Sequence, residues 1–396
     1  MSVNKNIFLE NLGQTSPFPF LIEIDKAEGI YIHDKSGKIY MDMISGVSVN
    51  NIGHRHPKVV DALHKQIDRH LHVMVYGEFI QDSVSLMAQR LVRLLPNSLD
   101  CVYPVNSGTE AIEASLKLVK RATQRTEIVA FRGSYHGSTM GSLSVSGNEL
   151  KKMAFRPLMS DVRFIQFNNI EDLIHITIKT AGVIVETIQG DAGVRIPDVS
   201  FMKALRKRCD EVGAMLIFDE IQAGLGRTGK MFAFEHFGVV PDVLTLGKAL
   251  GGGMNIGALI SSKTNLALFT HAPMLGHITT FGGHPVPCAA AAAALDVLIS
   301  LDFDEVERLG KRLEDILHQS EEVIEIRRKG MFIAIDMKSA ERVSEVVARC
   351  LEVGVLTFWF LSHPYSFRLA PPLTISEEEI DKAGLLILNA IKETKT

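Results

Sequence analysis

The sequence predicts an α/β protein with a large domain built on a mostly parallel sheet and a smaller α+β domain. Its 396 residues exceed what one ordinary hydrophobic core holds. In the middle of the chain, short apolar runs alternate with amphipathic stretches, which is typical of a sheet covered on both faces. After residue 300, amphipathic helical patterns surround a strand-like segment, and this indicates the second unit.

The N-terminal segment predicts a β-hairpin. Two strand-like segments, 29–32 and 38–42, flank a turn from Asp34 to Gly37. Residues 1–14 lack the charged and then apolar order of a secretion signal. From about Pro57 the pattern becomes helical. We place the large domain at 53–290 and the small one at 1–52 plus 291–396.

The central and C-terminal elements follow from the apolar pattern. Short apolar runs predict the strands of the central sheet, at 128–131, 183–185, 215–218, 243–246 and 257–261. The Ala-rich run 288–300 predicts a helix against a close neighbour, too short and too weakly hydrophobic to span a bilayer. The small domain is predicted to contain a strand at 330–335 and helices at 303–316, 340–353 and 377–391.

Composition limits the possible partners and location. A net charge of -4 gives no basic field to attract nucleic acid. The four cysteines lie far apart without a CxxC pair, so neither a disulfide framework nor a zinc site is indicated and a reducing cytoplasm fits best. The histidine pairs 54/56 and 70/72 are two residues apart and would point away from each other on a helix. We expect a cytoplasmic protein without metal, nucleic acid or membrane partner.

Lys248 is the first candidate catalytic residue. It lies two residues after the strand predicted at 243–246 and before the glycines 251–253, at a strand end with uncrowded backbone. A desolvated lysine amine beside other positive charge loses its proton and attacks carbonyl groups. The alternative is an ordinary surface lysine in a glycine-rich loop.

Asp219 ends another predicted strand, 215–218, and Glu220 follows it. A protonated pyridine nitrogen needs such an anionic partner if the ring is to withdraw electrons. A buried aspartate that caps a helix or binds a backbone amide is the alternative.

Residues 106–110 precede the helical stretch 111–120 and place small residues with free backbone N–H groups at a helix start. A helix N-terminus concentrates unpaired donors and partial positive charge, so this segment could hold a phosphate. The alternative is simple N-capping by Ser107 or Thr109.

In this order the motifs resemble those of the class III aminotransferases, of the large fold family typified by aspartate aminotransferase. The likeness runs from Asn51 to Leu373 and is greatest for the acetylornithine, ornithine and 4-aminobutyrate enzymes. Its most specific blocks are 106–110, 134–137, 218–222, 226–229, 246–249 and 279–283. The resemblance implies the pyridoxal-phosphate-dependent transferase fold (fold type I), pyridoxal 5'-phosphate as cofactor, and transfer of an amino group. The implied donor is an ω-amino acid such as N-acetylornithine, with 2-oxoglutarate or another keto acid as acceptor; the alternative donors are 4-aminobutyrate, ornithine, lysine and diamines.

The resemblance also implies roles for single residues. Lys248 would carry the cofactor as a Schiff base, and Asp219 would pair with its pyridine nitrogen. Tyr135 would stack on the ring, and Gln222 would approach its hydroxyl. Thr280 would reach the cofactor phosphate of the partner subunit in a homodimer. The implied cofactor-binding residues are Ser107, Gly108, Thr109, Tyr135, His136, Glu186, Asp219, Gln222, Lys248 and Thr280.

The substrate residues follow the family pattern only in part. Arg368 matches the arginine that clamps an α-carboxylate. Asp191 stands where the family has a glutamate that neutralises this arginine, and its shorter arm would weaken or displace that switch. Ser138 replaces an arginine that helps bind the distal or sole carboxylate, and Val47 replaces a tyrosine of the ornithine enzymes. The identity of the donor therefore stays open.

Parts of the sequence are also compatible with two other classes of function. The segment 224–229 formally fits the G-x-G-x-x-G pattern of an NAD-dependent dehydrogenase. The pattern neither starts at the strand end nor opens a clear helix, as a dinucleotide site requires. A protein that binds the cofactor without turnover is the other alternative, and the presence of Arg368 argues against it, because binding alone needs no substrate clamp.

Overall fold

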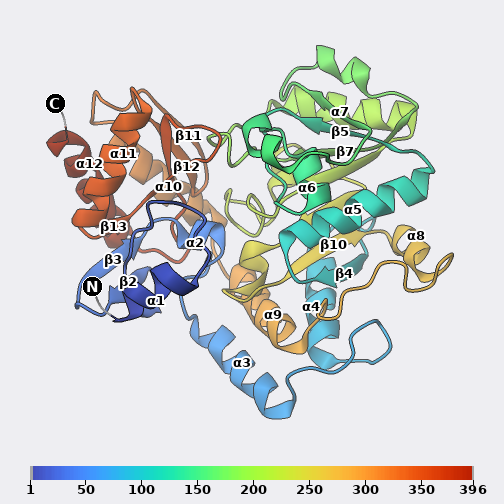
Figure 1. The fold of residues 1–396 in the computed structure, drawn as a ribbon, viewed down its shortest axis with the longest axis horizontal. Coiled ribbons are helices and arrows are strands. Elements are labelled where there is room, and N and C mark those ends of the chain that lie inside the picture. The colour runs from blue at the N-terminus through green and yellow to red at the C-terminus, as the bar shows by residue number, and fades with distance from the viewer. Residues whose placement is uncertain (1–2, 395–396) are drawn as a thin grey trace.

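A computed structural model describes residues 3–394 of the chain. Figure 1 shows two groups of elements side by side. One contains the large central sheet and its helices. The other brings the N-terminal strands next to the C-terminal helices. The predicted α/β class is confirmed, whereas the domain bounds, which also include residues outside 3–394, stay a prediction.

The large sheet has seven strands in the order β4-β10-β9-β8-β7-β5-β6. Only β10 runs antiparallel to its neighbours, so the sheet is mostly parallel as predicted. The five predicted apolar runs all form strands. The strands are β4 (Cys101–Val105), β5 (Glu127–Phe131), β6 (Val162–Ile165), β7 (Thr180–Glu186), β8 (Met215–Asp219), β9 (Val243–Leu246) and β10 (Gly257–Ser261).

Both faces of this sheet are covered, which explains why the central strands are apolar throughout. Along β7, Val183 and Val185 belong to one hydrophobic cluster with Phe201 of α7, while Ile184 belongs to a second cluster with Leu116 of α5. Successive side chains of a strand point to opposite faces, so each face needs its own apolar partner. The helices around this sheet are α3 (Pro57–Arg69), α4 (Asp82–Arg93), α5 (Gly108–Thr123), α6 (Met140–Val145), α7 (Val199–Val212), α8 (Lys263–Leu266) and α9 (Pro285–Ile299).

Two smaller sheets complete the fold. One has the order β1-β2-β3-β13, and there β13 runs parallel to β3, with Val355 opposite Met41. This pairing joins an N-terminal strand to a C-terminal strand in one sheet. The other sheet is antiparallel, in the order β11-β12-β15-β14. The strands are β1 (Ile24–Glu28), β2 (Tyr31–Asp34), β3 (Ile39–Asp42), β11 (Glu325–Lys329), β12 (Phe332–Asp336), β13 (Val355–Leu356), β14 (Phe358–Trp359) and β15 (Ser366–Leu369).

The three helices predicted near the C-terminus are confirmed within two residues of their expected ends, and the predicted N-terminal hairpin is β2 and β3. The helices of this part are α1 (Val3–Asn11), α2 (Ser45–Ser48), α10 (Phe303–Leu317), α11 (Ala340–Glu352) and α12 (Glu377–Glu393). Short 3-10 helices are η1 (Glu149–Lys151), η2 (Met153–Phe155), η3 (Glu171–His175), η4 (Ala233–His236), η5 (Lys248–Gly251) and η6 (Ala267–Thr270).

The Ala-rich helix α9 packs against α3 and α4, as the small side chains predict. Among residues 3–394 no single helix is long and apolar enough to cross a membrane. The pair α9 and α10 passes the same test of length and composition jointly, and it is bent by 79° at the break between the helices.

Candidate active site

The candidate catalytic residues meet at the carboxyl ends of parallel strands. Glu186 ends β7 and lies opposite Asp219, which ends β8. Asp219 in turn lies opposite Thr245 of β9, and Lys248 follows that strand by two residues. Parallel strands bring their carboxyl ends to the same edge of a sheet, where ligands of α/β proteins bind.

Asp219 is held rigidly by its neighbours. Its Oδ2 lies 2.7 Å from Nδ1 of the fully buried His136, and its Oδ1 accepts a 3.0 Å hydrogen bond from the backbone N–H of Ile221. Nε2 of His136 has no hydrogen-bond partner among the described residues. A proton on Nδ1 would be donated to Oδ2 of Asp219 and would hold the carboxylate in this orientation.

Lys248 starts the 3-10 helix η5 with a left-handed backbone, at φ 42°. Burial lowers the pKa of its amine, the carboxylates of Asp219 and Glu186 act in the opposite direction, and Arg368 adds to the lowering. A lowered pKa increases the share of the neutral amine, which is the nucleophilic form.

Glu186 lies beneath the segment that carries Tyr135. Its Oε1 accepts the backbone N–H of Tyr135 at 2.9 Å, and its Oε2 accepts that of Gly190 at 3.0 Å. Burial raises the pKa of Glu186 to about 7; His136 opposes the rise, and the negative charge of Asp219 adds to it. Glu186 therefore sets the position of two loops and titrates near neutral pH.

This raised pKa predicts a pH dependence of stability. The folded protein binds the proton of Glu186 more tightly than the unfolded chain does. The contribution of this proton to the free energy of unfolding is therefore full below pH 4.5 and is lost as pH rises to about 7. The loss is on the order of 3 kcal/mol. In Glu186→Gln this component should be missing, so the free energy of unfolding should fall less between pH 5 and pH 8 than in the unchanged protein. Urea unfolding of the cofactor-free proteins at several pH values measures both slopes, and equal slopes would contradict the assignment.

Residues 106–110 form a helix start as predicted. The Ser107 side chain caps α5 by accepting the backbone N–H of Glu110 at 3.3 Å, so the capping alternative is part of the structure. The N–H groups of Gly108 and Thr109 belong to the first turn and have no acceptor within the helix. A side chain at Gly108 would lie 2.8 Å from Ile221, so only glycine lets the helix start approach the carboxyl end of β8. Capping and anion binding are therefore compatible here.

Gln222 and Tyr135 lie beside the same strand ends. The buried Nε2 of Gln222 has no hydrogen-bond partner in the described part of the chain, and its Oε1 lies against Gly190. Tyr135 is half-buried, and its hydroxyl lies 3.3 Å from Oγ of Ser138. An unpaired buried amide donor marks a place where a ligand acceptor fits.

Arg368 comes from the small antiparallel sheet and reaches the same place. It is 5% exposed, its guanidinium lies 4.4 Å from the ring centre of Phe360, and its Nη2 lies 3.2 Å from Oδ1 of Asp191. Burial lowers its pKa, and Asp191 opposes this. The shorter arm of Asp191 does reach Arg368, although the carboxylate also accepts bonds from the backbone N–H of Leu361 (3.1 Å) and the hydroxyl of Ser362 (2.9 Å).

The remaining predicted residues are Val47, Ser138 and Thr280. Val47 has a left-handed backbone in α2, two residues after Ser45, whose hydroxyl donates to the carbonyl of Ala370 just after β15. Ser138 and Thr280 are exposed in the single chain. The partners Phe360 and Ser362 of the Arg368 site were not predicted, because nothing in the sequence relates them to Asp191 more than 150 residues earlier.

The G-x-G-x-x-G segment serves a structural purpose. It forms successive turns, not the start of an α-helix, so the dinucleotide interpretation is wrong. Its fully buried Arg227 donates to the carbonyls of Met331 (3.1 Å) and Pro371 (2.7 Å) and to the side chain of Asn51. The segment thereby connects three distant parts of the chain. Among residues 3–394, no group of three or more His, Cys, Asp or Glu side chains could hold a metal ion.

Comparisons with known proteins identify the family of this chain. Residues 13–391 match the family model for class III aminotransferases. An acetylornithine aminotransferase of Methanopyrus kandleri is 37% identical over 378 residues, 94% of this chain and 95% of that protein. An ornithine aminotransferase of Macrococcus caseolyticus is 37% identical over 384 residues, 94% of each chain.

Solved structures share the fold. The ornithine aminotransferase of Toxoplasma gondii superposes with a TM-score of 0.91 at 28% identity, covering 98% of this chain and 94% of that one. Another structure of that enzyme, with a TM-score of 0.90 and 29% identity over 98% and 93% of the two chains, has pyridoxal phosphate at partial occupancy in its active site. These matches confirm the predicted transferase fold, and the family depends on pyridoxal phosphate. The chain therefore belongs to the class III aminotransferases and is a transaminase acting on small-molecule amino donors and acceptors.

Proposed function

We propose that this transaminase binds pyridoxal 5'-phosphate at Lys248 and moves an amino group from an ω-amino acid, such as N-acetylornithine, to 2-oxoglutarate or another keto acid. The observation that carries the proposal is that a lysine, a fixed aspartate and a helix N-terminus meet at one edge of the sheet, with a buried arginine beside them.

The residues present fit the cofactor. The N-terminus of α5, with Gly108 and Thr109, suits a phosphate group, and the unpaired amide of Gln222 suits an oxygen on the ring. Tyr135 offers an aromatic face and Asp219 an anion for the ring nitrogen. Bound there, pyridoxal phosphate supplies an aldehyde that condenses with amines and a ring that withdraws electrons.

Lys248 would have two roles. Its amine, made less basic by burial, would hold the cofactor between turnovers. Once released by the donor amine, the same nitrogen would move a proton to and from the substrate carbon. Asp219, fixed by His136 and Ile221, would keep its carboxylate directed at the ring nitrogen.

The choice of donor rests on the charged residues and on the relatives. Arg368 can hold a carboxylate of the acceptor, and Asp191 can neutralise Arg368 while a donor reacts through an amine remote from its carboxylate. Relatives named acetylornithine and ornithine aminotransferases support such ω-amino donors. With Ser138 and Val47 in the pocket, 4-aminobutyrate, ornithine, lysine and diamines are the alternatives.

The test has two parts. Borohydride reduction of the purified yellow protein, followed by peptide mapping, should find the cofactor attached at Lys248. A screen of N-acetylornithine, ornithine, 4-aminobutyrate, lysine and diamines against 2-oxoglutarate should then rank the donors. Attachment at another residue, or turnover of none of these donors, would overturn the proposal.

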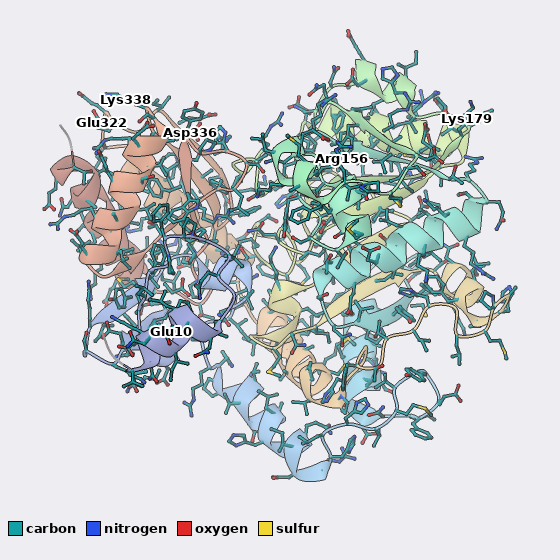
Figure 2. All side chains as sticks on the ribbon, in the orientation of Figure 1. Glu10, Arg156, Lys179, Glu322, Asp336 and Lys338 are labelled. Atoms are coloured by element: carbon teal, nitrogen blue, oxygen red, sulfur yellow. The ribbon has the colours of Figure 1, made fainter. Side chains whose placement is uncertain are left out.

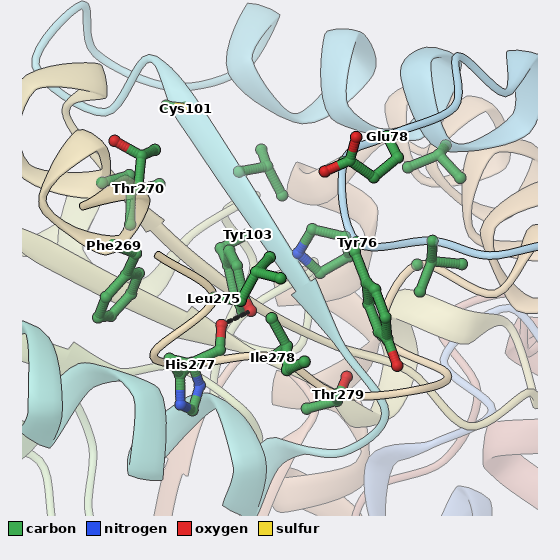
Figure 3. A pocket seen from close by; sticks show the side chains of 18 of the residues that line it. Tyr76, Glu78, Cys101, Tyr103, Phe269, Thr270, Leu275, His277, Ile278 and Thr279 are labelled. Atoms are coloured by element: carbon green, nitrogen blue, oxygen red, sulfur yellow. Dashed lines mark hydrogen bonds between the residues drawn. The ribbon is translucent and has the colours of Figure 1, made fainter. Parts of the chain in front are cut away.

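A homodimer is also part of the proposal. An apolar cavity of about 760 Å³ lies over β4, lined by Tyr76, Leu275, Ile278 and Thr279 (Figure 3). Ile80 at this cavity is 96% exposed, and Phe79 and Met274 of the same lining add further exposed apolar surface, as does Phe281, two residues after Thr279. Exposed apolar patches of this kind mark protein interfaces. Thr280, which we expect to reach the partner subunit, directly follows Thr279 of the cavity lining.

Ile80→Asp combined with Met274→Asp should convert the dimer into 43.7 kDa monomers, because both charges would be buried in the interface. Light scattering after size-exclusion chromatography measures the mass. Ile178→Asp, at an apolar residue that is 75% exposed on the turn before β7, should leave the dimer intact. A monomeric unchanged protein would contradict the proposed assembly.

We also propose a cytoplasmic location. All four cysteines are free thiols, and three of them are buried, as expected in a reducing compartment. A fluorescent fusion protein imaged in intact cells would test the location.

A further inference from the structure

Lys151 approaches the part of the site where Ser138 replaces the family's arginine. Its ammonium lies 5.8 Å from the centre of the Tyr135 ring, and the hydroxyl of the same ring lies 3.3 Å from Oγ of Ser138. The chain therefore places a cation beside the ring from another segment, although position 138 carries none.

The charge of Lys151 is only partly neutralised. Its Nζ lies 3.6 Å from Oδ2 of Asp191, beyond the 2.7–2.9 Å typical of a charge-assisted hydrogen bond. Asp191 already accepts bonds from Arg368, Leu361 and Ser362. The Lys151 side chain is also 31% exposed, so a ligand can reach it.

The segment that carries Lys151 is held in place. Asn148 caps η1 by accepting the N–H of Leu150 at 3.1 Å, and its amide donates to the Ser362 hydroxyl at 2.9 Å. The Ser362 hydroxyl donates in turn to Asp191. This chain of bonds connects η1 to the loop beside Arg368, so Lys151 is positioned and not merely nearby.

Lys152, the next residue, has different partners from Lys151. Lys152 is buried, lies 3.2 Å from Glu149 and 4.1 Å from the ring centre of Phe164, and donates to the carbonyl of Ser144. Glu149 also pairs with Arg156 at 2.5 Å. Glu149 is therefore paired with both Lys152 and Arg156. Of the three cations in this segment, Lys151 alone points to the active site.

Together, Arg368 and Lys151 carry two positive charges and Asp191 one negative charge, which leaves one positive charge for a bound carboxylate. We propose that Lys151 is a specificity-determining residue that binds the carboxylate remote from the reacting carbon, in the amino donor and in a dicarboxylic acceptor. This inference rests on the proposed function, since it assumes substrates with a carboxylate at that end.

The test compares Lys151→Gln and Lys151→Arg with Arg156→Gln in the holoenzyme. Arg156, which is labelled in Figure 2, lies five residues after Lys151 in the sequence. Its loss changes the net charge equally, but it is paired with Glu149. Calorimetric titration with glutarate, a dicarboxylate without an amine, should give at least about tenfold weaker binding for Lys151→Gln. Lys151→Arg should stay within about threefold of the unchanged protein, and Arg156→Gln should bind glutarate equally well.

Kinetics add a second measurement with matched donors. Lys151→Gln should raise KM for ornithine about tenfold with little change in kcat, and should leave putrescine, the same chain without the carboxylate, unaffected. If no ω-amino donor were turned over, the proposed function would fail, whereas the glutarate titration would still decide the role of Lys151. Equal glutarate binding by Lys151→Gln, equal weakening by Arg156→Gln, or no glutarate binding by the unchanged protein would overturn the inference.

Discussion

Replacing Lys248 with alanine should lower kcat/KM by about 10⁴-fold or more. The amine that lies beside Asp219 and Glu186 would be lost, and with it both the attachment of the cofactor and the group that moves the proton. Stopped-flow or coupled assays with a donor found in the screen measure the effect. Borohydride should then no longer attach the cofactor to the peptide that contains position 248.

A folding defect can be separated from this loss. Lys248 has a left-handed backbone at φ 42°, and alanine meets a strain there similar to that of lysine. The cofactor-free variant should therefore keep a thermal midpoint within a few degrees of the unchanged protein. Phosphate binding at α5 should also persist, because the helix start does not involve Lys248. Turnover within about tenfold of the unchanged enzyme would contradict the role of Lys248.

The central sheet could be predicted because its strands are buried on both faces. Val183 to Val185 stand out as an uninterrupted apolar run for that reason. The edge strands β4 and β6 escaped prediction, since they are only partly buried and contain Pro104 and Arg163. An edge strand is paired on one side only, so it does not need a backbone N–H at every residue for hydrogen bonds to a neighbour. It does not need a fully apolar pattern either.

The same difference applies to the site. Lys248 and Asp219 were predictable because each lies just after or at the end of an apolar run, and parallel strands bring such ends together. The surroundings of Asp191 were not, because Ser362 and Lys151 reach it from loops whose course depends on tertiary packing. Local sequence indicates where strands end, but not which loops meet above them.

Changing Asp219 to asparagine should lower kcat by about 10³-fold with a smaller effect on substrate KM. An amide has no charge with which to keep a pyridine nitrogen protonated, and its NH₂ group can also oppose a proton on Nδ1 of His136, 2.7 Å away. Steady-state kinetics across pH, together with the absorbance of the bound cofactor, measure the change.

Glu220 offers a matched control one residue further on. Burial raises its pKa to about 8, so it is largely neutral at pH 7, and its oxygens accept the backbone N–H groups of Ala233 (2.7 Å) and Phe234 (2.6 Å) on η4. In Glu220→Gln, one of these backbone N–H groups would face the NH₂ group of the amide, which cannot accept its hydrogen bond. The free energy of unfolding should therefore fall by about 1–3 kcal/mol. Its kcat should stay within about threefold at a temperature where the variant is folded, since no charge beside the cofactor changes. If both variants lost activity equally, the effect of Asp219 would be one of local structure and not of its charge.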